Sequence, residues 1–555
     1  MNPEAPAANW MERLWPWLAA AVSGVMLAAA YAPWNQAWLG WVGLGPLLAA
    51  LWLRRREKPG RGIDFALGWV AGLVYFVGAF QWLRTVTVGG WLALAVYLAL
   101  YPGIFALLVG RVPARLERWF PGKRVGRFLS SRRNLLTAAV TAICWVAGEW
   151  LRQRVLGGFG WNTLGVASHD ILGMVQICEI GGVPMLSGIM AFCGAILVVT
   201  FVRFLQELGR QKVRPHFDFT ITMALIGVCF VHGVNSLREE SETHPLRVAL
   251  VQPNIPQVEK WDVEQGDAIL AKLVSLTEVA IPWEPDLTVW PESATPEPFF
   301  NHRHTFDTLR ELATRVSGGL MLGTLEYTFG PEREPKDFNC AIFFQPGGAT
   351  FENYRKLYLV PFGEYVPFRN EIPLLDKIVG GRVAGDFQAG TETVIFKMPD
   401  TPVRMAPLIC FEDTLPRIAD RFVKAGANLF VNLTNDAWFL DSAGAAQHFA
   451  NARLRTVEFR IPMIRCANTG ITTIVDTKGV MRQTLRDENG STFTDGVLMG
   501  VVQVPVNPRV TLFARWGDWF GTGCLVLAGL WAATGFKIAL WRKRSKAAEI
   551  VSTHS

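Results

Sequence analysis

Three residues with complementary chemistry follow short apolar runs in the second half of the sequence. Glu292 ends the run "LTVWPE", Lys356 lies in "YRKLYLV", and Cys410 ends "APLIC". A cysteine attacks a carbonyl carbon as its thiolate, a nearby carboxylate takes the thiol proton, and an ammonium stabilises the resulting oxyanion. Placed at three strand ends, these residues predict an acyl-transfer site.

The residues after Cys410 single it out among the eight cysteines of the chain. The stretch "TLPRIADRF" at 414–422 predicts a helix that begins just behind it. The positive end of a helix dipole lowers the pKa of a thiol, so we expect Cys410 to favour the thiolate. The backbone N–H of Phe411 is a candidate donor to an oxyanion. Cys340 and Cys466 lack a following helix start and are predicted to be core residues.

Short strands alternate with helices through residues 245–506, the part of the chain that must position these side chains. The β-rich runs lie at 246–255, 286–293, 319–327, 339–346, 403–413, 427–436 and 469–477, and the helical stretches at 264–281, 304–317, 414–426 and 445–460. This alternation predicts an α/β domain whose helices cover the sheet faces. The sequence contains no GxGxxG and no GxxxxGK(S/T), so a nucleotide-binding fold has no motif support.

Histidine and metal chemistry have little support in the sequence. His448 lies inside a helical stretch and is predicted to be a satisfied structural side chain rather than a base, and Asn435 and Asp436 are predicted to shape a loop. No His, Asp or Glu cluster has the spacing of metal ligands. No CxxC pair indicates a zinc site or a disulfide framework. We therefore expect a site that uses no metal and no cofactor.

The remaining sequence indicates a membrane protein. Half of the 555 residues are hydrophobic, the mean hydropathy is positive, and Trp and Phe are abundant. Apolar runs of about spanning length predict eight transmembrane helices, at 14–33, 36–53, 63–83, 89–110, 134–151, 183–204, 219–237 and 519–541. Basic clusters follow the second, fourth, sixth and eighth runs. This alternation predicts cytoplasmic termini and places the stretch before the last span on the opposite face.

The net charge of +7 does not indicate a nucleic-acid partner. The basic residues cluster between apolar runs and form no stripe with exposed aromatic residues. The segment 152–182 mixes Trp, Phe, Gly and apolar residues. It predicts either a re-entrant or interfacial segment or a loop packed over the helices, and the sequence leaves both open.

Taken in chain order, "WPE", "YRKLYLVPFGE" and "CFE" resemble the Glu–Lys–Cys signature of the nitrilase superfamily, which implies an αββα sandwich. The order of spans and domain, with "LTNDAWF" at 433–439 and "TLFARWGDWF" at 511–520, is similar to the apolipoprotein N-acyltransferase family of bacterial inner membranes. This resemblance implies a membrane domain with seven transmembrane helices at 1–244, a periplasmic catalytic domain at 245–506, and a last transmembrane helix with a cytoplasmic tail at 507–555.

The resemblance also implies a role for each residue of the site. Glu292 is the base, Lys356 the electrostatic stabiliser and Cys410 the nucleophile. Glu364 and Glu412 are supporting acids that hold the lysine or share the proton.

Aromatic residues are implied to line the path of the acyl chain: Phe411, Trp438 and Phe439. Leu440 departs from the family pattern, because glycine is expected after "DAWF". The departure puts the local turn in question and leaves the chemistry unchanged.

The implied reaction moves an acyl chain from a phospholipid, through a Cys410 thioester, to the α-amine of an N-terminal S-diacylglyceryl-cysteine. This is the last step of lipoprotein maturation. The expected partners are the phospholipid, the apolipoprotein and bilayer lipid, and the expected location is the bacterial inner membrane with the catalytic domain in the periplasm. Two alternatives remain open: a membrane-tethered carbon–nitrogen hydrolase that uses water, and a non-catalytic scaffold or transporter. The tethered hydrolase is disfavoured because one span is enough for tethering and eight are predicted. The scaffold or transporter is disfavoured because all three triad positions are filled and the spans show no buried charge relay.

Overall fold

The computed structural model describes residues 10–54, 62–119, 127–207, 216–260, 262–295, 297–330, 333–366, 369 and 387–534. The chain forms two compact units. A helical unit contains Met1–Ser168, Gly181–Val231 and Asp518–Ser555 as far as they are described. An α/β unit contains His169–Ile180 and His232–Gly517.

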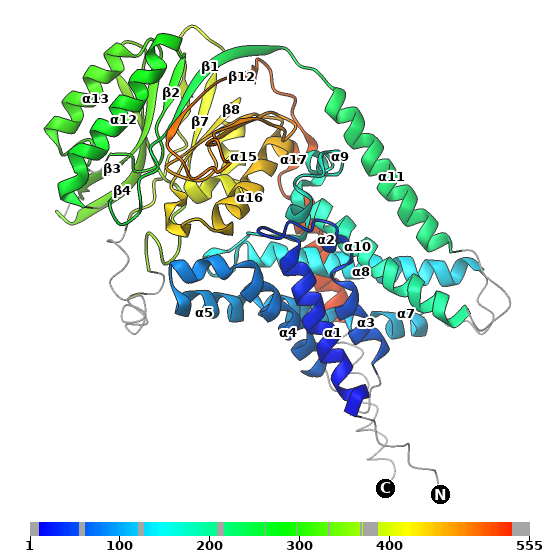
Figure 1. The fold of residues 1–555 in the computed structure, drawn as a ribbon. Helices are drawn as coiled ribbons and strands as arrows, with labels where there is room; N and C mark the ends of the chain where they lie inside the picture. Colours follow the sequence, from blue (N-terminus) through cyan, green and yellow to red (C-terminus); the bar gives the residue numbers. More distant parts are fainter. Residues whose placement is uncertain are drawn as a thin grey trace, which may run out of the picture. The chain divides into compact units, whose positions relative to one another are not determined.

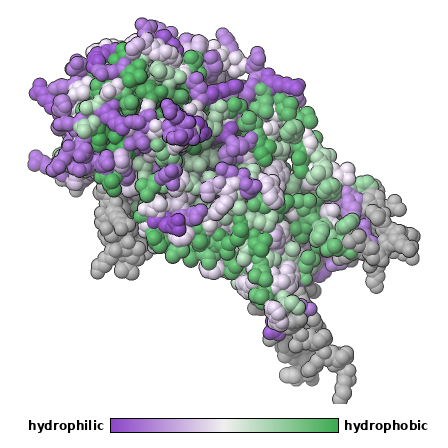
Figure 2. Space-filling view, in the orientation of Figure 1, coloured by the Kyte–Doolittle hydropathy of each residue, from purple (hydrophilic) through white to green (hydrophobic). Residues whose placement is uncertain are grey.

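Most helices of the first unit overlap the predicted apolar runs, whereas α7 lies between the fourth and fifth runs (Figure 1). They are α1 (Trp10–Ala29), α2 (Leu39–Val42), α3 (Gly45–Leu53), α4 (Gly62–Ala79), α5 (Val88–Leu98), α6 (Leu100–Val109), α7 (Val112–Trp119), α8 (Arg127–Arg152), α10 (Cys178–Glu207) and α11 (Phe217–Arg238), which continues into the α/β unit. Many of their side chains are apolar, and the visible face of this unit is largely hydrophobic, whereas that of the α/β unit is largely hydrophilic (Figure 2).

Five described helical stretches are long and apolar enough to cross a membrane: Gly62–Ala79, Val88–Trp119, Ser131–Arg152, Cys178–Leu205 and Phe217–Arg238. Shorter apolar helices at Leu39–Leu53 and Trp519–Thr534 coincide with the second and eighth predicted spans. These helices indicate a membrane protein, while the number of eight spans stays a prediction. Residues 535–541 of the last predicted span and the basic cluster at 542–546 lie outside the described residues.

Two six-stranded sheets form the centre of the α/β unit. The first has the order β12 (Gly496–Pro505), β1 (Thr243–Gln252), β2 (Leu287–Val289), β3 (Gly319–Phe329), β4 (Pro335–Phe344) and β5 (Phe351–Arg355). The second has the order β11 (Met481–Thr484), β10 (Thr473–Val475), β9 (Met463–Ala467), β8 (Leu429–Thr434), β7 (Arg404–Ile409) and β6 (Phe396–Lys397). In each sheet a central run of strands is parallel, β1–β2–β3 and β7–β8–β9.

Helices lie outside both sheets (Figure 1). They are α12 (Gly266–Ala280) and α13 (Arg303–Arg315) beside the first sheet and α15 (Pro416–Lys424) and α16 (Ala443–Phe459) beside the second. The two sheets meet at Cys466, whose Sγ lies 3.3 Å from the carbonyl oxygen of Val251 and 3.2 Å from that of Val289. Cys340 is also fully buried, so both predicted core cysteines are confirmed. The predicted α/β domain is likewise confirmed.

The segment 152–182 is divided between the two units, whereas both predictions treated it as one piece. Residues 169–180 pack within the α/β unit and include α9 (Leu172–Val175). Glu179 Oε2 accepts from Arg460 Nε at 2.8 Å and from Arg509 Nη2 at 2.6 Å. Gln176 accepts from Arg460 at 2.7 Å and donates to the carbonyl of Lys478 at 3.0 Å. The α/β unit thus takes in residues that precede the boundary at 244. The three-part division of the chain stays a prediction.

Candidate active site

Glu292 lies in the turn after β2, and this turn is fastened to β3. The backbone N–H of Trp290 donates to the carbonyl of Met321, and that of Ala294 donates to the carbonyl of Gly323, both at 2.8 Å. A Cβ atom at Gly323 would lie 2.6 Å from the Cα atom of Glu292. Glycine is therefore required here so that the backbone that carries Glu292 can approach β3 closely.

Lys356 and Cys410 each follow the last residue of a strand, β5 in the first sheet and β7 in the second. The N–H of Lys356 donates to the carbonyl of Asn339 on β4 at 2.8 Å. Cys410 begins the 3₁₀ turn η6 (Cys410–Thr414) with a φ of +52°, a left-handed conformation that costs about 1–3 kcal/mol in a residue other than glycine. The amide of Asn432 on β8 donates to the Cys410 carbonyl at 3.2 Å and supports this strained turn.

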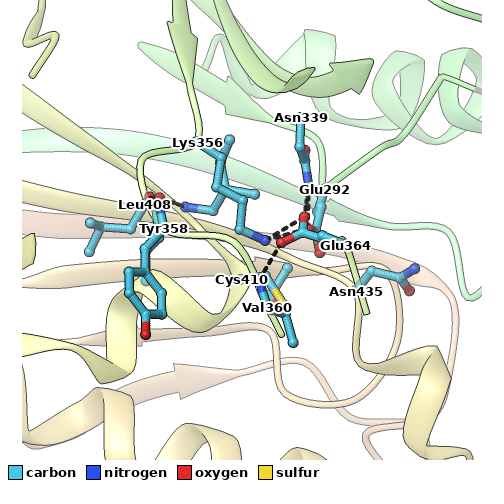
Figure 3. A network of polar contacts seen from close by, with 12 residues as sticks. Glu292, Asn339, Lys356, Tyr358, Val360, Glu364, Leu408, Cys410 and Asn435 are labelled. Atoms are coloured by element: carbon cyan, nitrogen blue, oxygen red, sulfur yellow. Dashed lines mark hydrogen bonds and ion pairs between the residues drawn. The ribbon is translucent and has the colours of Figure 1, made fainter. Parts of the chain in front are cut away.

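These strand ends bring the three predicted catalytic residues together (Figure 3). Lys356 Nζ lies 2.9 Å from Glu364 Oε1 and 3.4 Å from Glu292 Oε1. The amide nitrogen of Asn339 donates to the same two carboxylates, at 2.8 Å to Glu292 and 2.9 Å to Glu364. Cys410 lies beside this network. Two carboxylates, an ammonium and a thiol therefore share one site that both sheets build.

The charges of the site differ from the sequence-based expectation for Cys410. Cys410 does stand at the turn into the predicted helix, since η6 begins at Cys410 and α15 follows at Pro416, but the predicted lowering of the thiol pKa is wrong. Burial, and then the negative charge of Glu292, raise the pKa of the Cys410 thiol well above its usual range and outweigh the opposite effect of Lys356. The resting group is thus the thiol, which needs a base during the reaction. The residue as a whole keeps some solvent exposure, so a substrate can reach it.

Lys356 keeps its charge in this buried place. Although burial disfavours the ammonium, the carboxylates of Glu364 and Glu292 outweigh that effect and raise the pKa of Lys356. The lysine is therefore a fixed cation at neutral pH. A fixed cation beside a thiol is the arrangement that stabilises a developing oxyanion.

The two predicted supporting acids have different partners. Glu364 binds the ammonium of Lys356 and also accepts from the N–H of Val360 at 2.8 Å. Glu412 instead accepts from the backbone N–H groups of Leu357 at 2.7 Å and Tyr358 at 3.0 Å, and from that of Ile409 at 2.8 Å. Burial raises the pKa of the Glu412 carboxyl to about 7 even though these donors oppose the rise. Glu412 thus fastens the segment after Lys356 to the strand end before Cys410.

Aromatic side chains lie on both sides of Cys410 in the sequence. The ring of Tyr358 stacks with that of Phe411 at a centroid distance of 6.1 Å. Trp438, in the 3₁₀ turn η7 (Asp436–Phe439), is 44% exposed, and Phe439 is half-buried and packs against Gly444 at the start of α16. Leu440, where the sequence resemblance led us to expect glycine, has a φ of +51° and a ψ of −162°, a backbone conformation that favours glycine.

A buried charge cluster lies directly behind η6 and combines Asp413, Asp436, His448 and Arg465. His448 Nε2 lies 3.0 Å from Asp413 Oδ1, and its Nδ1 lies 2.8 Å from Asp436 Oδ1. Arg465 binds Asp413 at 2.5 Å and Asp436 at 2.9 Å, and it donates to Asn432 at 2.9 Å. His448 is a satisfied side chain, as predicted. Asp436, predicted only to shape a loop, also belongs to this cluster, which supports the Cys410 turn through Asn432.

The charge of His448 follows from its two carboxylates. Burial lowers the pKa of the imidazole, but Asp413 and Asp436 outweigh burial and the repulsion of Arg465, so the pKa rises to about 9. The ring is therefore an imidazolium at neutral pH. Two acids and two cations leave the cluster without net charge.

Sequence reasoning missed Asn339 and Lys260. Asn339 lies inside β4, and Lys260 Nζ donates to the carbonyl oxygen of Glu292 at 2.8 Å from the loop after β1. The sequence could have indicated Asn339, because its amide lies beside Cys340 in an apolar strand, where a buried polar side chain requires a hydrogen-bond partner. Lys260, in "QVEKW", had the sequence context of a surface lysine.

Comparison with known proteins gives a consistent result along the whole chain. Residues 23–196 match the model of the apolipoprotein N-acyltransferase N-terminal domain, and residues 247–505 match that of carbon-nitrogen hydrolase. The apolipoprotein N-acyltransferase of Geobacter metallireducens is 32% identical over 537 residues, which cover 94% of this chain and 95% of that protein. The enzyme of the same name from Brucella melitensis biotype 1 is 32% identical over 540 residues, with coverages of 93% and 95%.

Among solved structures, Saccharomyces cerevisiae Nit3, a nitrilase-superfamily member, is 16% identical and covers 48% of this chain and 92% of its own, with a TM-score of 0.35. That score carries no weight, and the assignment rests on the sequence similarity over almost the full length. The chain belongs to the apolipoprotein N-acyltransferase family.

Proposed function

We propose that this protein moves an acyl chain from a phospholipid to the α-amine of an N-terminal S-diacylglyceryl-cysteine, through a thioester on Cys410. The observation that carries this proposal is the grouping of Glu292, Lys356 and Cys410 at the ends of β2, β5 and β7. A buried thiol with a raised pKa needs a positioned base. Glu292, which hydrogen bonds from Lys356 and Asn339 hold in place, is the base that we propose, while Glu364 accepts from the same two donors and holds the lysine. The apolar helices suit a reaction between two lipids.

In the first half-reaction, Glu292 takes the proton of the thiol while the Cys410 sulfur attacks the ester carbonyl carbon of the phospholipid. The oxyanion is stabilised by the ammonium of Lys356 and the backbone N–H of Phe411. The carbon–oxygen bond to the glycerol then breaks, Glu292 returns the proton to the leaving alkoxide, and a lysophospholipid departs. An acyl thioester remains on Cys410.

In the second half-reaction, the neutral amine of the diacylglyceryl-cysteine attacks the thioester carbon. Glu292 takes a proton from the attacking nitrogen, the carbon–sulfur bond breaks, and Cys410 regains its proton. The product is an amide. In this scheme Trp438 and Phe439 line the acyl path, Glu364 and Glu412 hold the lysine segment, and no metal or cofactor takes part. We propose that the α/β unit lies on the periplasmic side of the bacterial inner membrane.

The test uses purified full-length protein and a phospholipid with a labelled acyl chain. Wild-type protein should acquire a label that hydroxylamine releases and that mass spectrometry locates on Cys410. Cys410→Ala should acquire none, whereas Cys340→Ala should acquire the wild-type amount. Adding a diacylglyceryl lipopeptide should move the label into an amide. Label on another cysteine, or ammonia release from small amides in place of acyl transfer, would contradict the proposal and favour a carbon–nitrogen hydrolase.

A further inference from the structure

The loop after β1 ends in a lysine whose side chain turns into the protein. Lys260 is only 4% exposed, and its ammonium donates to the carbonyl oxygen of Glu292 at 2.8 Å. The loop itself is well anchored, because the N–H of Asn254 donates to the carbonyl of Asn468 and the N–H of Lys260 donates to that of Pro256. The position of this lysine is therefore built into the fold.

A carbonyl oxygen alone does not explain a buried ammonium. An ammonium carries three N–H donors, and burying its charge without an anion nearby is costly. In the described part of the chain, the bond to Glu292 is the one hydrogen bond of the Lys260 side chain. The negative charges that favour its ammonium are those of the Glu292 carboxylate and, once the thiol has lost its proton, of the Cys410 sulfur. Lys260 is thus a second buried cation, held at the backbone of Glu292.

Charge balance shows what this second cation contributes. Glu292 and Glu364 carry two negative charges and Lys356 carries one positive charge, which leaves the site at −1. Lys260 adds a second positive charge on the side of Glu292. When the proton of Cys410 passes to Glu292, the negative charge moves to sulfur and then to the substrate oxygen. Without Lys260, that anion would form in a site that is already negative.

We infer that Lys260 is a positioning and charge-balancing residue of the acyl-transfer site, which holds the Glu292 backbone and stabilises the anion that forms on Cys410 and on the substrate. The inference rests on the proposed function, in which Cys410 is the nucleophile and Glu292 the base.

The ionisation of Lys260 gives this role a pH signature. Burial lowers the pKa of its ammonium to about 8, although Glu292 and Cys410 oppose the shift. The cation is present below that pH and is lost above it. Thioester formation should therefore decline as the pH rises through about 8. An arginine at this position would keep its charge throughout, because its pKa exceeds 12.

The experiment compares full-length wild type with Lys260→Met, Lys260→Arg and the control Lys272→Met, whose lysine pairs with Asp495 at the surface of α12. Two rates are followed from pH 6 to pH 10: alkylation of Cys410 by iodoacetamide, located by mass spectrometry, and thioester formation from labelled phospholipid. We expect Lys260→Met to slow both the alkylation of Cys410 and thioester formation at pH 7, where the Lys260 cation is present in wild type, each by about tenfold. Lys260→Arg should form the thioester without the decline near pH 8, and Lys272→Met should match wild type.

An unchanged rate of Cys410 alkylation at pH 7 in Lys260→Met would overturn the inference. A decline in thioester formation near pH 8 that persists in Lys260→Arg would also overturn the inference. This arginine variant decides the question if Lys260→Met fails to fold. A wild-type protein that forms no thioester would instead contradict the proposed function, and the alkylation profiles would then decide the inference alone.

Discussion

The side-chain amide of Asn339 donates to Glu292 at 2.8 Å, so the proposed base is held by a residue from the middle of β4. The same nitrogen reaches Glu364 at 2.9 Å. Because Lys356 contacts the same two carboxylates, Asn339 and Lys356 together fix the distance between the carboxylates of Glu292 and Glu364. The orientation of Glu292 thus depends on a neutral donor as well as on an ion pair.

Replacing Asn339 by Leu should slow thioester formation about 10- to 100-fold, because a hydrogen bond to a charged group contributes about 1.5–3 kcal/mol. The control is Asn353→Leu, which removes an amide that donates to Glu326 at 3.1 Å. Thioester accumulation from labelled phospholipid measures both variants. Equal losses in the two would show that the effect is general destabilisation.

Lys356→Met should remove the main cation of the site and reduce the rate of thioester formation at least about 100-fold, as loss of one oxyanion donor does. Glu292→Gln should have a similar effect for a different reason, since its amide cannot accept the thiol proton. The rate of label uptake on Cys410 measures each. If Glu292→Gln acquires label at the wild-type rate, the base is another group, and Glu412 is the first to test.

Leu440→Gly should stabilise the protein by about 1 kcal/mol. The substitution removes strain of about 1–3 kcal/mol at φ +51° but adds freedom to the unfolded chain. The expected rise in unfolding temperature is roughly 2–4 °C. Leu440→Ala is the matched variant, because it shortens the side chain and keeps the Cβ atom. A similar rise in both would attribute the gain to loss of the exposed apolar side chain, which is 59% exposed.

Stability should fall in alkaline solution because of His448. Its pKa is about 9 in the folded protein and about 6.5 when unfolded, so the folded state binds more protons between these values. The contribution is complete below pH 6.5 and disappears as the pH rises through about 9. Thermal unfolding between pH 6 and 10 should therefore show a smaller alkaline decrease in His448→Gln than in wild type. Lys260 and Glu412 also titrate here, but they are the same in both proteins, and equal slopes would contradict the imidazolium assignment.

The sequence predicted what depends on local pattern. Glu292 and Cys410 end apolar strands, and the predicted strands and helices of the α/β unit are present. The charge state of Cys410 could not be predicted, because it follows from burial and from Glu292, which lies 118 positions earlier in the chain. The helix-dipole argument failed because burial of the thiol and the charge of Glu292 raise its pKa.

The residues that were missed reach the site through tertiary contacts. Lys260 has the local context of a surface lysine and is buried only because its loop folds back over Glu292. Arg465 could have indicated a buried ion pair, since it is a charged residue inside the apolar strand "MIRCA". Its partners Asp413 and Asp436 lie in other elements, so the sequence pattern could not identify them.

The pairing of β1 with β12 has a consequence for the synthesis of the protein. The two strands pair from Thr243↔Pro505 to Gln252↔Gly496, so residues 253–495 are made between them. The chain is synthesised at about 5–20 residues per second, so the edge of β1 that pairs with β12 stays unpaired for on the order of 10–50 s. Glu179 lacks its two arginine partners for longer, because Arg460 and Arg509 follow it by 281 and 330 positions. An interrupted nascent chain would therefore carry an open strand edge and a Glu179 carboxylate without its two arginine partners, so almost the whole polypeptide must be synthesised before the α/β unit is complete.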